Sequence, residues 1–267
     1  MKLSACVITY NEADRIDRCL SALTFCDEIL VVDSLSTDAT VALATARGAR
    51  VLSRPFTGYR SQKQFAVEQA RHEWILCVDA DEVVTDPLRE EILALRAEGF
   101  QQHAGWSIPR MTEYAGRFLR HGNAWPDRIV RLFDRRRGQY AGREVHEHVR
   151  VEGTVGRIAA PLEHYSYRDL DDHLTRMSRY ATLMAESLHE SGRSVTAPGV
   201  WLRPWWRFLR GMLIKAGVLD GWRGFAFHLV EARYVREKYL RVWLAQREAG
   251  RSFLRPGVKS ETMQRRQ

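Results

Sequence analysis

Apolar segments rich in β-branched residues alternate with helical patterns over the first 80 residues, and no other feature constrains the fold as strongly. Four of these segments are predicted strands, at residues 2–10, 28–32, 50–53 and 74–78. Between them, Ile16, Leu20 and Leu23 recur at helical spacing, and further helices are predicted before Gly48 and over 61–70. Strands that alternate with short helices form right-handed βαβ units, so the sequence predicts an α/β fold with a parallel sheet covered on both faces.

Polar and acidic residues follow directly on three of the predicted strands. They are Tyr10 and Glu12 after the first strand, Asp33 after the second, and Asp79 and Asp81 after the fourth. The carboxyl ends of parallel strands meet at one edge of a sheet, and open α/β sheets bind their ligands at that edge. The sequence therefore predicts a polar ligand site there.

The second half of the chain has a less regular pattern. Beyond residue 101, WSIPR (106–110), RIVRLF (128–133) and VRVEG (149–153) predict strands of a mixed or antiparallel portion of the sheet. Apolar residues at three- and four-residue spacing predict an amphipathic helix over 169–190. Residues 191–199 have the composition of a linker.

Composition and charge narrow the class of protein. The chain has 267 residues, 45% of them hydrophobic, which is typical of a folded protein. Residues 200–267 contain 15 basic and 5 acidic side chains, a net charge of +10, against 26 and 28 in residues 1–199, a net charge of −2. No stretch reaches the ~18 apolar residues of a spanning helix and no signal-peptide pattern opens the chain, so we expect a cytoplasmic protein. The four cysteines have no paired spacing, and we expect free thiols.

The Asp79-Ala80-Asp81 motif is the sharpest local signal of chemistry. Two carboxylates just past a buried strand are suited to a divalent cation, Mg²⁺ or Mn²⁺, and to the phosphates that the cation bridges. The alternative is a solvated acidic turn, and the acids at neighbouring strand ends favour the metal. The sequence contains neither a P-loop nor a G-x-G-x-x-G motif, which argues against a Walker-type ATPase and against a dinucleotide-binding enzyme.

Four motifs in order carry a resemblance to a known family. TYNE (9–12), DSLSTDAT (33–40), Gln62-Lys63 and VDADE (78–82) resemble the nucleotide-sugar domain of inverting family 2 glycosyltransferases. WPDRIVRLF (125–133), GREVHEHV (142–149) and LEHYSY (162–167) are similar to bacterial lipopolysaccharide-core β-1,4-glucosyltransferases, with which the resemblance runs nearly full length. It implies a GT-A, Rossmann-like fold with a mixed, mostly parallel sheet, helices on both faces and a C-terminal amphipathic helical segment.

The resemblance also implies roles for individual residues. Those implied to hold the nucleoside are Thr9, Tyr10, Glu12 and Asp33, with Lys63 near the diphosphate. Asp79, with Ala80, would contact the donor ribose or the metal, Asp81 would be the principal metal ligand, and His164 would complete the metal shell. The family's catalytic base comes in an acidic pair, and His146-Glu147 stands at that place here. Glu147 is therefore the predicted base, with Glu144 and Asp127 as alternatives.

The last quarter of the chain combines aromatic and basic residues. Trp201, Trp205, Trp206 and Trp222 are interleaved with arginines and a lysine between 201 and 225, a pattern typical of segments at a membrane interface. Further on, one helical face is apolar, with Leu229, Ala232, Val235, Tyr239 and Val242. The alternatives are packing on the rest of the chain, self-association and nucleic-acid binding. We predict a catalytic domain at 1–195, divided into a nucleotide-sugar part (1–90) and an acceptor and metal part (91–195), followed by a membrane-associating tail at 196–267.

These expectations combine into one predicted activity. The chain would be an inverting, metal-dependent hexosyltransferase that moves glucose from UDP-glucose to a lipid-linked lipopolysaccharide-core acceptor. It would be peripheral on the inner face of the cytoplasmic membrane, with an anionic membrane surface and not nucleic acid as its partner. The alternatives are a glycosyltransferase for a peptide or another glycolipid, a nucleotidyltransferase, and a non-catalytic nucleotide-binding module docked on a membrane.

Overall fold

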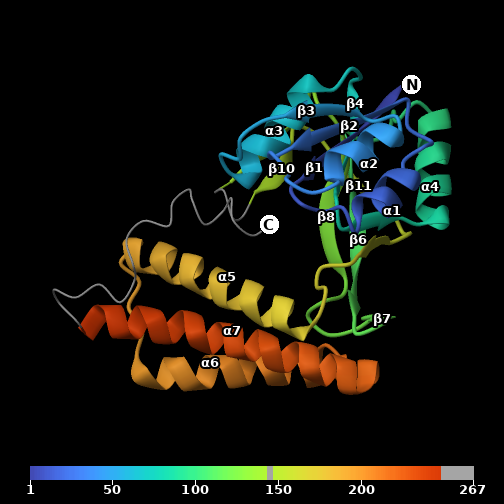
Figure 1. The fold of residues 1–267 in the computed structure, drawn as a ribbon. Helices are drawn as coiled ribbons and strands as arrows, with labels where there is room; N and C mark the ends of the chain where they lie inside the picture. Colours follow the sequence, from blue (N-terminus) through green and yellow to red (C-terminus); the bar gives the residue numbers. More distant parts are fainter. Residues whose placement is uncertain (143–146, 248–267) are drawn as a thin grey trace. The chain divides into compact units, whose positions relative to one another are not determined.

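The structure, a computed structural model, describes residues 1–142 and 147–247 and contains two compact units. Unit 1 comprises residues 1–110 and 127–164, apart from 143–146. Unit 2 comprises residues 111–126 and 165–247 of the described chain (Figure 1).

Unit 1 contains the predicted alternation of strands and helices. Four parallel strands lie in the order β3-β2-β1-β4, namely β1 (Leu3–Thr9), β2 (Glu28–Asp33), β3 (Arg50–Ser53) and β4 (Trp74–Asp79). The helices of this half are α1 (Ile16–Ser21), α2 (Thr40–Ala46) and α3 (Tyr59–Gln69). These elements agree with the predicted ones to within a few residues at each end.

The remaining strands extend the sheet with antiparallel pairs. β8 (Asp127–Asp134) runs antiparallel to β4 and to β6 (Gly105–Tyr114), and β12 (Leu162–His164) runs antiparallel to β5 (Glu82–Val84). β11 (Val155–Arg157) is parallel to β6, while β9 (Gly138–Ala141) and β10 (His148–Val151) form a separate antiparallel pair. α4 (Asp86–Ala97) begins where the Thr85 hydroxyl accepts a hydrogen bond from the Leu88 amide, 3.3 Å away. The mixed sheet of the predicted fold class is confirmed.

Both faces of this sheet are covered, because successive side chains of a strand point to opposite sides. Leu3, Ala5 and Val7 of β1 pack in one apolar cluster with residues of α1, α2 and α4. Cys6 of the same strand packs in a second cluster with residues of α3. All four cysteines are free thiols, as predicted.

Unit 2 is mainly helical. α5 (Leu170–Glu190), α6 (Ala197–Leu209) and α7 (Gly221–Arg247) are its main elements, and α7 lies between the other two (Figure 1). A turn of π-helix, η1 (Arg210–Ile214), and one of 3₁₀-helix, η2 (Gly217–Asp220), join α6 to α7, and the short strand β7 (Arg117–Phe118) pairs with the end of β6. None of the helices within residues 1–142 and 147–247 is both long and apolar enough to cross a bilayer.

The division into units differs from the boundary predicted at residue 195. α5 groups with α6 and α7 and packs on α7, and Ala185, Val195, Val200 and Val242 form one buried cluster. Of the predicted apolar face of the last helix, Val235 and Val242 are buried, whereas Leu229 is 54% exposed.

His173 of α5 is the most enclosed histidine of unit 2. Its side chain is fully buried, stacked on Tyr167 at 3.8 Å between ring centroids and facing Phe227 at 5.6 Å. Nδ1 lies 3.2 Å from the Tyr114 hydroxyl, and Nε2 has no hydrogen-bond partner within the described chain. Burial lowers the pKa of His173 to about 4, against a smaller opposing effect of Asp172.

This lowered pKa predicts a loss of stability in mild acid. In the unfolded chain, His173 takes up a proton below pH ~6.5, whereas in the folded protein it stays neutral down to about pH 4. The free energy of unfolding therefore decreases as the pH falls from about 6.5 to 4. Between pH 7 and pH 5, we expect the free energy of unfolding to fall by roughly 2 kcal/mol less in His173→Phe than in wild type. Urea unfolding at the two pH values measures this difference. The exposed His189, replaced by Gln, is the control and should behave as wild type; equal losses in all three proteins would contradict the prediction.

Candidate functional site

The strand register of unit 1 gathers the predicted polar residues at one edge of the sheet. Thr9 of β1 is paired with Asp33 of β2, and Ile8 of β1 is paired with Asp79 of β4. Thr9, Asp33 and Asp79 therefore lie side by side at the carboxyl ends of three adjacent parallel strands. This is the edge at which open α/β sheets bind ligands.

The loops after β1 and β2 are joined by polar contacts. The Asn11 amide donates to the Ser36 hydroxyl at 2.9 Å, and the Thr37 amide donates to the Asn11 side-chain oxygen at 2.8 Å. Ser36 in turn donates its amide to the carboxylate of Asp33, which is 1% exposed. The Glu12 amide, in the same loop, donates to the Thr40 hydroxyl at 2.8 Å. These contacts fix the backbone around the predicted nucleoside residues, with Tyr10 half-buried beside them.

Lys63 of α3 connects two of the predicted site residues. Its Nζ lies 3.0 Å from the Asp79 carboxylate and 3.0 Å from the Glu147 carboxylate. Burial alone would lower the pKa of Lys63, but the two carboxylates offset it and hold the pKa above its usual value. The structure thus brings Lys63, Asp79 and Glu147 together.

Arg131 of β8 is a site residue that the sequence analysis missed. Its guanidinium, 4% exposed, pairs with the Asp79 carboxylate and lies 2.6 Å from the carboxylate of Glu82, which is fully buried. Burial alone would raise the pKa of Asp79, but Arg131 and Lys63 hold it well below its usual value. The signal in the sequence was a single arginine inside the apolar run RIVRLF, since an arginine is rarely buried unless it is paired.

A second arginine, Arg110 of β6, places Asp127 in the same network. Its Nε and Nη2 donate to the Asp127 carboxylate at 3.0 and 2.6 Å, and its Nη1 lies 3.4 Å from Glu82. Asp127, an alternative base, is therefore held through one carboxylate oxygen, Oδ2, which accepts hydrogen bonds from two nitrogens of Arg110. The other alternative, Glu144, lies outside the described residues.

We expect Arg131 to be a large contributor to the stability of unit 1. Arg131→Met keeps most of the side-chain volume but leaves the buried Glu82 and Asp79 short of a positive charge, so the free energy of unfolding should fall by about 3 kcal/mol. Urea unfolding followed by circular dichroism measures it. Arg150→Met, at an exposed position of β10, is the matched control. A loss of less than 1 kcal/mol for Arg131→Met would show that the network is not stabilising.

Asp81 has different surroundings from Asp79. Its carboxylate lies 3.5 Å from Nε2 of His164 at the end of β12, and 3.7 Å from a terminal nitrogen of Arg15. Burial opposes the effect of His164, yet the pKa of Asp81 is lowered. A carboxylate oxygen and an imidazole nitrogen are donors that suit a divalent metal. Ala80, between the two aspartates, is 6% exposed.

Among the described residues, no three His, Cys, Asp or Glu side chains are grouped to hold a metal by themselves. Both Asp79 oxygens contact cationic side chains, Lys63 and Arg131. Of the residues that the sequence predicts as metal ligands, Asp81 and His164 are therefore the two whose side chains could hold a metal together.

Four buried polar atoms around this edge have no hydrogen-bond partner within residues 1–142 and 147–247. They are the Thr9 hydroxyl, the Gln62 side-chain oxygen, Nη1 of Arg15 and Nε of Arg131. An unsatisfied buried polar atom costs about 1–3 kcal/mol, so native proteins keep few of them. Thr9 is the strand partner of Asp33, while Arg15 and Arg131 form ion pairs with Asp81 and Asp79. This pattern indicates a site that a polar ligand completes.

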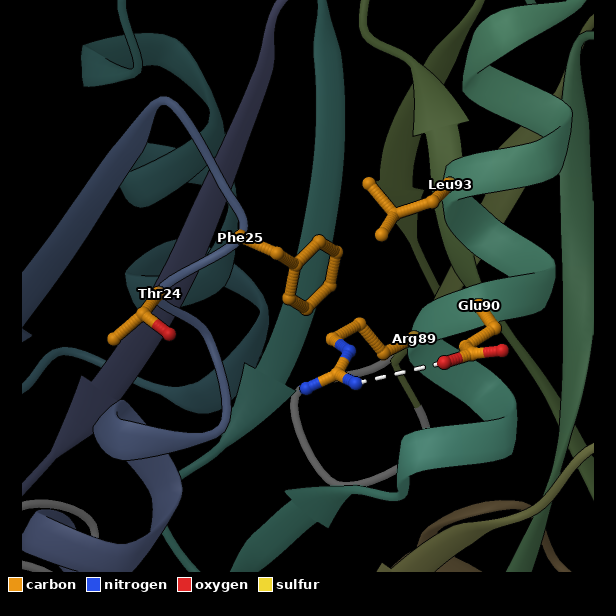
Figure 2. A pocket seen from close by; sticks show the side chains of 5 residues that line it. All are labelled: Thr24, Phe25, Arg89, Glu90 and Leu93. Carbon is orange, nitrogen blue, oxygen red and sulfur yellow. Dashed lines mark ion pairs between the residues drawn. The ribbon is translucent and has the colours of Figure 1, made fainter.

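A separate hollow lies away from these residues. The hollow has a volume of about 580 Å³ and is lined by Thr24, Phe25, Arg89, Glu90 and Leu93. Phe25 is directed toward α4, and the Arg89 guanidinium lies 3.6 Å from the Glu90 carboxylate (Figure 2). Thr24 and Phe25 precede β2, so this hollow is at the amino end of that strand, opposite Asp33. It contains none of the predicted site residues.

Comparison with known proteins assigns the family. Residues 4–150 match the family model described as Glycosyl transferase family 2. The chain belongs to glycosyl transferase family 2. The matched segment includes the polar edge from Thr9 to Glu147, and the predicted enzyme class, a glycosyltransferase, is confirmed.

Individual relatives of this glycosyltransferase cover nearly the whole chain. It is 30% identical to the lipopolysaccharide core biosynthesis glycosyltransferase LpsC of Rhizobium meliloti over 253 residues, which are 90% of this chain and 93% of LpsC. It is 28% identical to an uncharacterised glycosyltransferase of Rickettsia felis over 90% of this chain and 89% of that protein. The mannosyltransferase PcManGT of Pyrobaculum calidifontis, solved with GDP-mannose and Mn²⁺, has a TM-score of 0.52 at 15% identity, covering 92% of this chain and 88% of that one. This last likeness confirms the GT-A fold.

Proposed function

We propose that the chain transfers a hexose from a nucleotide sugar to a saccharide of the lipopolysaccharide core, with inversion at the anomeric carbon. The observation that carries the proposal is the contact chain from Glu147 through Lys63 to Asp79 at the polar edge. The relative from Rhizobium meliloti, a lipopolysaccharide core biosynthesis glycosyltransferase, supports the acceptor. The resemblance of the four N-terminal motifs supports a nucleotide-sugar donor, and the likeness of the motifs at 125–133, 142–149 and 162–167 to lipopolysaccharide-core β-1,4-glucosyltransferases supports UDP-glucose.

Glu147 is the proposed general base. In a single displacement, the acceptor oxygen forms its bond to the anomeric carbon while the bond from that carbon to the diphosphate breaks. The proton of the acceptor hydroxyl passes to the Glu147 carboxylate. Lys63, 3.0 Å from this carboxylate, keeps it oriented and supplies positive charge near the departing diphosphate.

Asp81 and His164 are the proposed holders of a divalent cation, Mg²⁺ or Mn²⁺. When bound, such an ion neutralises charge that develops on the diphosphate. Asp79, paired with Lys63 and Arg131, is left to accept hydrogen bonds from the donor ribose. PcManGT, solved with Mn²⁺ and a nucleotide sugar, supports a metal of this kind.

The unpartnered atoms of Thr9 and Gln62, together with Asp33, are the proposed contacts to the nucleoside. A hydroxyl and an amide oxygen can complete hydrogen bonds to ribose and base that the protein alone leaves unmade. A lipid-linked acceptor would place the enzyme at the inner face of the cytoplasmic membrane, and the net charge of +10 in residues 200–267 supports attraction to an anionic surface.

Donor binding tests the proposal directly. In a thermal-shift panel of UDP-glucose, UDP-galactose, UDP-N-acetylglucosamine and GDP-mannose with Mn²⁺, we expect UDP-glucose to raise Tm by several degrees, since a ligand at 100 times its Kd stabilises by about 2.7 kcal/mol. The shift should shrink when EDTA replaces Mn²⁺. A flat response to all four nucleotide sugars would contradict the proposal. A shift only with nucleoside triphosphates, with pyrophosphate released, would indicate a nucleotidyltransferase.

A further inference from the structure

Unit 2 exposes an unusual number of large apolar side chains along α6. Trp201, Leu202, Trp205, Trp206 and Leu209 are each between 42% and 66% exposed. Their spacing of one and four residues places them on one side of the helix. Val200 and Pro204 are the buried residues of α6, whose inner side packs on α7. The tryptophans therefore belong to an outer apolar stripe and not to the core of unit 2.

The turn after α6 continues this stripe. Leu213, Ile214, Val218 and Leu219 are between 54% and 68% exposed, and Trp222, Phe225 and Leu229 follow on α7 with 50% exposure or more. We call the outer stripe of α6, this turn and these three residues of α7 the hairpin face. The rings of Trp205 and Phe208 on α6 are 6.5 Å apart, and that of Phe208 is 5.5 Å from Phe225 on α7, which joins the exposed residues of the two helices. Exposed apolar surface of this extent marks an interaction site.

Glycines allow close packing of the helical hairpin formed by α6, the turn and α7, beneath the hairpin face. A Cβ on Gly211 would lie 2.0 Å from the ring of buried His228, and a Cβ on Gly224 would lie 2.2 Å from the carbonyl oxygen of Gly217. Only glycine allows these segments to approach so closely. With the interior of the turn filled by backbone and by His228, the large side chains of Leu213 and Leu219 stay in solvent.

The charged side chains around the hairpin face are mostly basic. Residues 197–231 contain five basic residues and only two acidic ones, Asp220 and Glu231. Asp220 accepts hydrogen bonds from the backbone amides of Arg120 and His121, and Glu231 is paired with Arg207 at 2.6 Å. Both carboxylates are thus engaged inside unit 2, whereas Arg210 and Lys215 are exposed. A symmetric copy would bring like charges together, whereas anionic lipid headgroups complement them.

We propose that the hairpin face inserts into the headgroup and acyl boundary of an anionic bilayer, and that apolar burial, with the cations in a secondary role, holds it there. Four tryptophans on or beside exposed leucines are suited to the interface between lipid and water. The proposed attachment is to one leaflet, as for an amphipathic surface that lies in the plane of the interface. The inference rests on the proposed function only for the lipid-linked acceptor. It narrows the predicted aromatic and basic tail at 196–267 to an apolar surface at 201–229.

Vesicle flotation of the full-length protein tests this inference. We expect binding to phosphatidylcholine vesicles with 30% phosphatidylglycerol, falling less than tenfold between 0.1 and 0.5 M NaCl, because salt screens charge but does not weaken apolar burial. Leu213→Ser with Leu219→Ser should lower binding at least tenfold at both salt concentrations. Arg210→Gln with Lys215→Gln should lower it only at 0.1 M NaCl. Leu93→Ser, at a 37% exposed position on α4, is the control and should bind as wild type.

Two vesicle results would overturn the inference: binding of the leucine double variant as tight as that of wild type, or loss of all wild-type binding in 0.5 M NaCl. It would also be overturned if light scattering showed that the wild type is a dimer and the leucine double variant a monomer. The last outcome would identify the hairpin face as an interface between copies. Circular dichroism and Tm show that each variant is folded. Transfer to a soluble, delipidated core oligosaccharide should be unchanged in the leucine variant, so failure of that reaction in the wild type would count against the proposed function and not against this surface.

Discussion

Asp81→Asn is expected to lower kcat/KM for glycosyl transfer by about 10³-fold. The asparagine keeps the shape of the side chain but removes the negative charge next to His164 and Arg15. A bound metal ion contributes several kcal/mol of charge stabilisation, and each 1.36 kcal/mol corresponds to a factor of ten in rate. Steady-state kinetics with a range of Mn²⁺ concentrations measures both the loss and the weaker metal dependence that should accompany it.

Two controls make this result specific. Glu90→Gln, at an exposed position of α4, removes one negative charge elsewhere in unit 1 and should leave kcat/KM unchanged. The Tm of Asp81→Asn should stay within a few degrees of wild type, which separates loss of chemistry from loss of fold. Full activity of Asp81→Asn, with an unchanged requirement for Mn²⁺, would place the metal on other residues.

Glu147→Gln is expected to lower kcat by about 10³-fold while leaving the donor-induced Tm shift in place. A positioned general base contributes about 10²- to 10⁴-fold, and glutamine cannot take the acceptor proton. Asp127→Asn should cost less than tenfold, because Asp127 is held by Arg110 at 3.0 and 2.6 Å, whereas Glu147 shares Lys63 with Asp79 at the polar edge. Single-turnover transfer and thermal shifts measured on the same preparations separate chemistry from binding.

The same comparison decides among the three candidate carboxylates. Glu144→Gln, the third candidate, belongs in the series, although this residue lies outside the described part of the chain. If Asp127→Asn or Glu144→Gln abolished transfer while Glu147→Gln retained it, the residue with the large loss would be the base. A loss of donor binding by Glu147→Gln would show that Glu147 acts on the nucleotide sugar and not on the acceptor.

The parallel half of the fold could be predicted because its signals are local. An apolar run as short as 74–78, bounded by polar residues and alternating with helical patterns, favours a buried strand. The register then follows from the fold class, which is why Thr9, Asp33 and Asp79 were expected at one edge and are found there. The residues that the strand ends present to a ligand were visible in the sequence for this reason.

The charge network could not be predicted, because it depends on contacts between residues far apart in sequence. Arg131 meets Asp79 across 52 positions and Lys63 meets Glu147 across 84. Nothing in the local pattern of RIVRLF indicates which carboxylate a buried arginine will face. The grouping of α5 with α6 and α7 is another long-range property, since an amphipathic stripe indicates that a helix packs without indicating its partner.

Product analysis tests the central claim most directly. The full-length protein, UDP-glucose, Mn²⁺ and a truncated lipopolysaccharide core oligosaccharide would be incubated together, and the products would be examined by mass spectrometry and proton NMR. We predict an acceptor heavier by one hexose, joined through a β-linkage, and one free UDP for each sugar transferred. An α-linkage would contradict the inverting displacement, and an unmodified core oligosaccharide alongside a glycosylated peptide acceptor would contradict the proposed substrate.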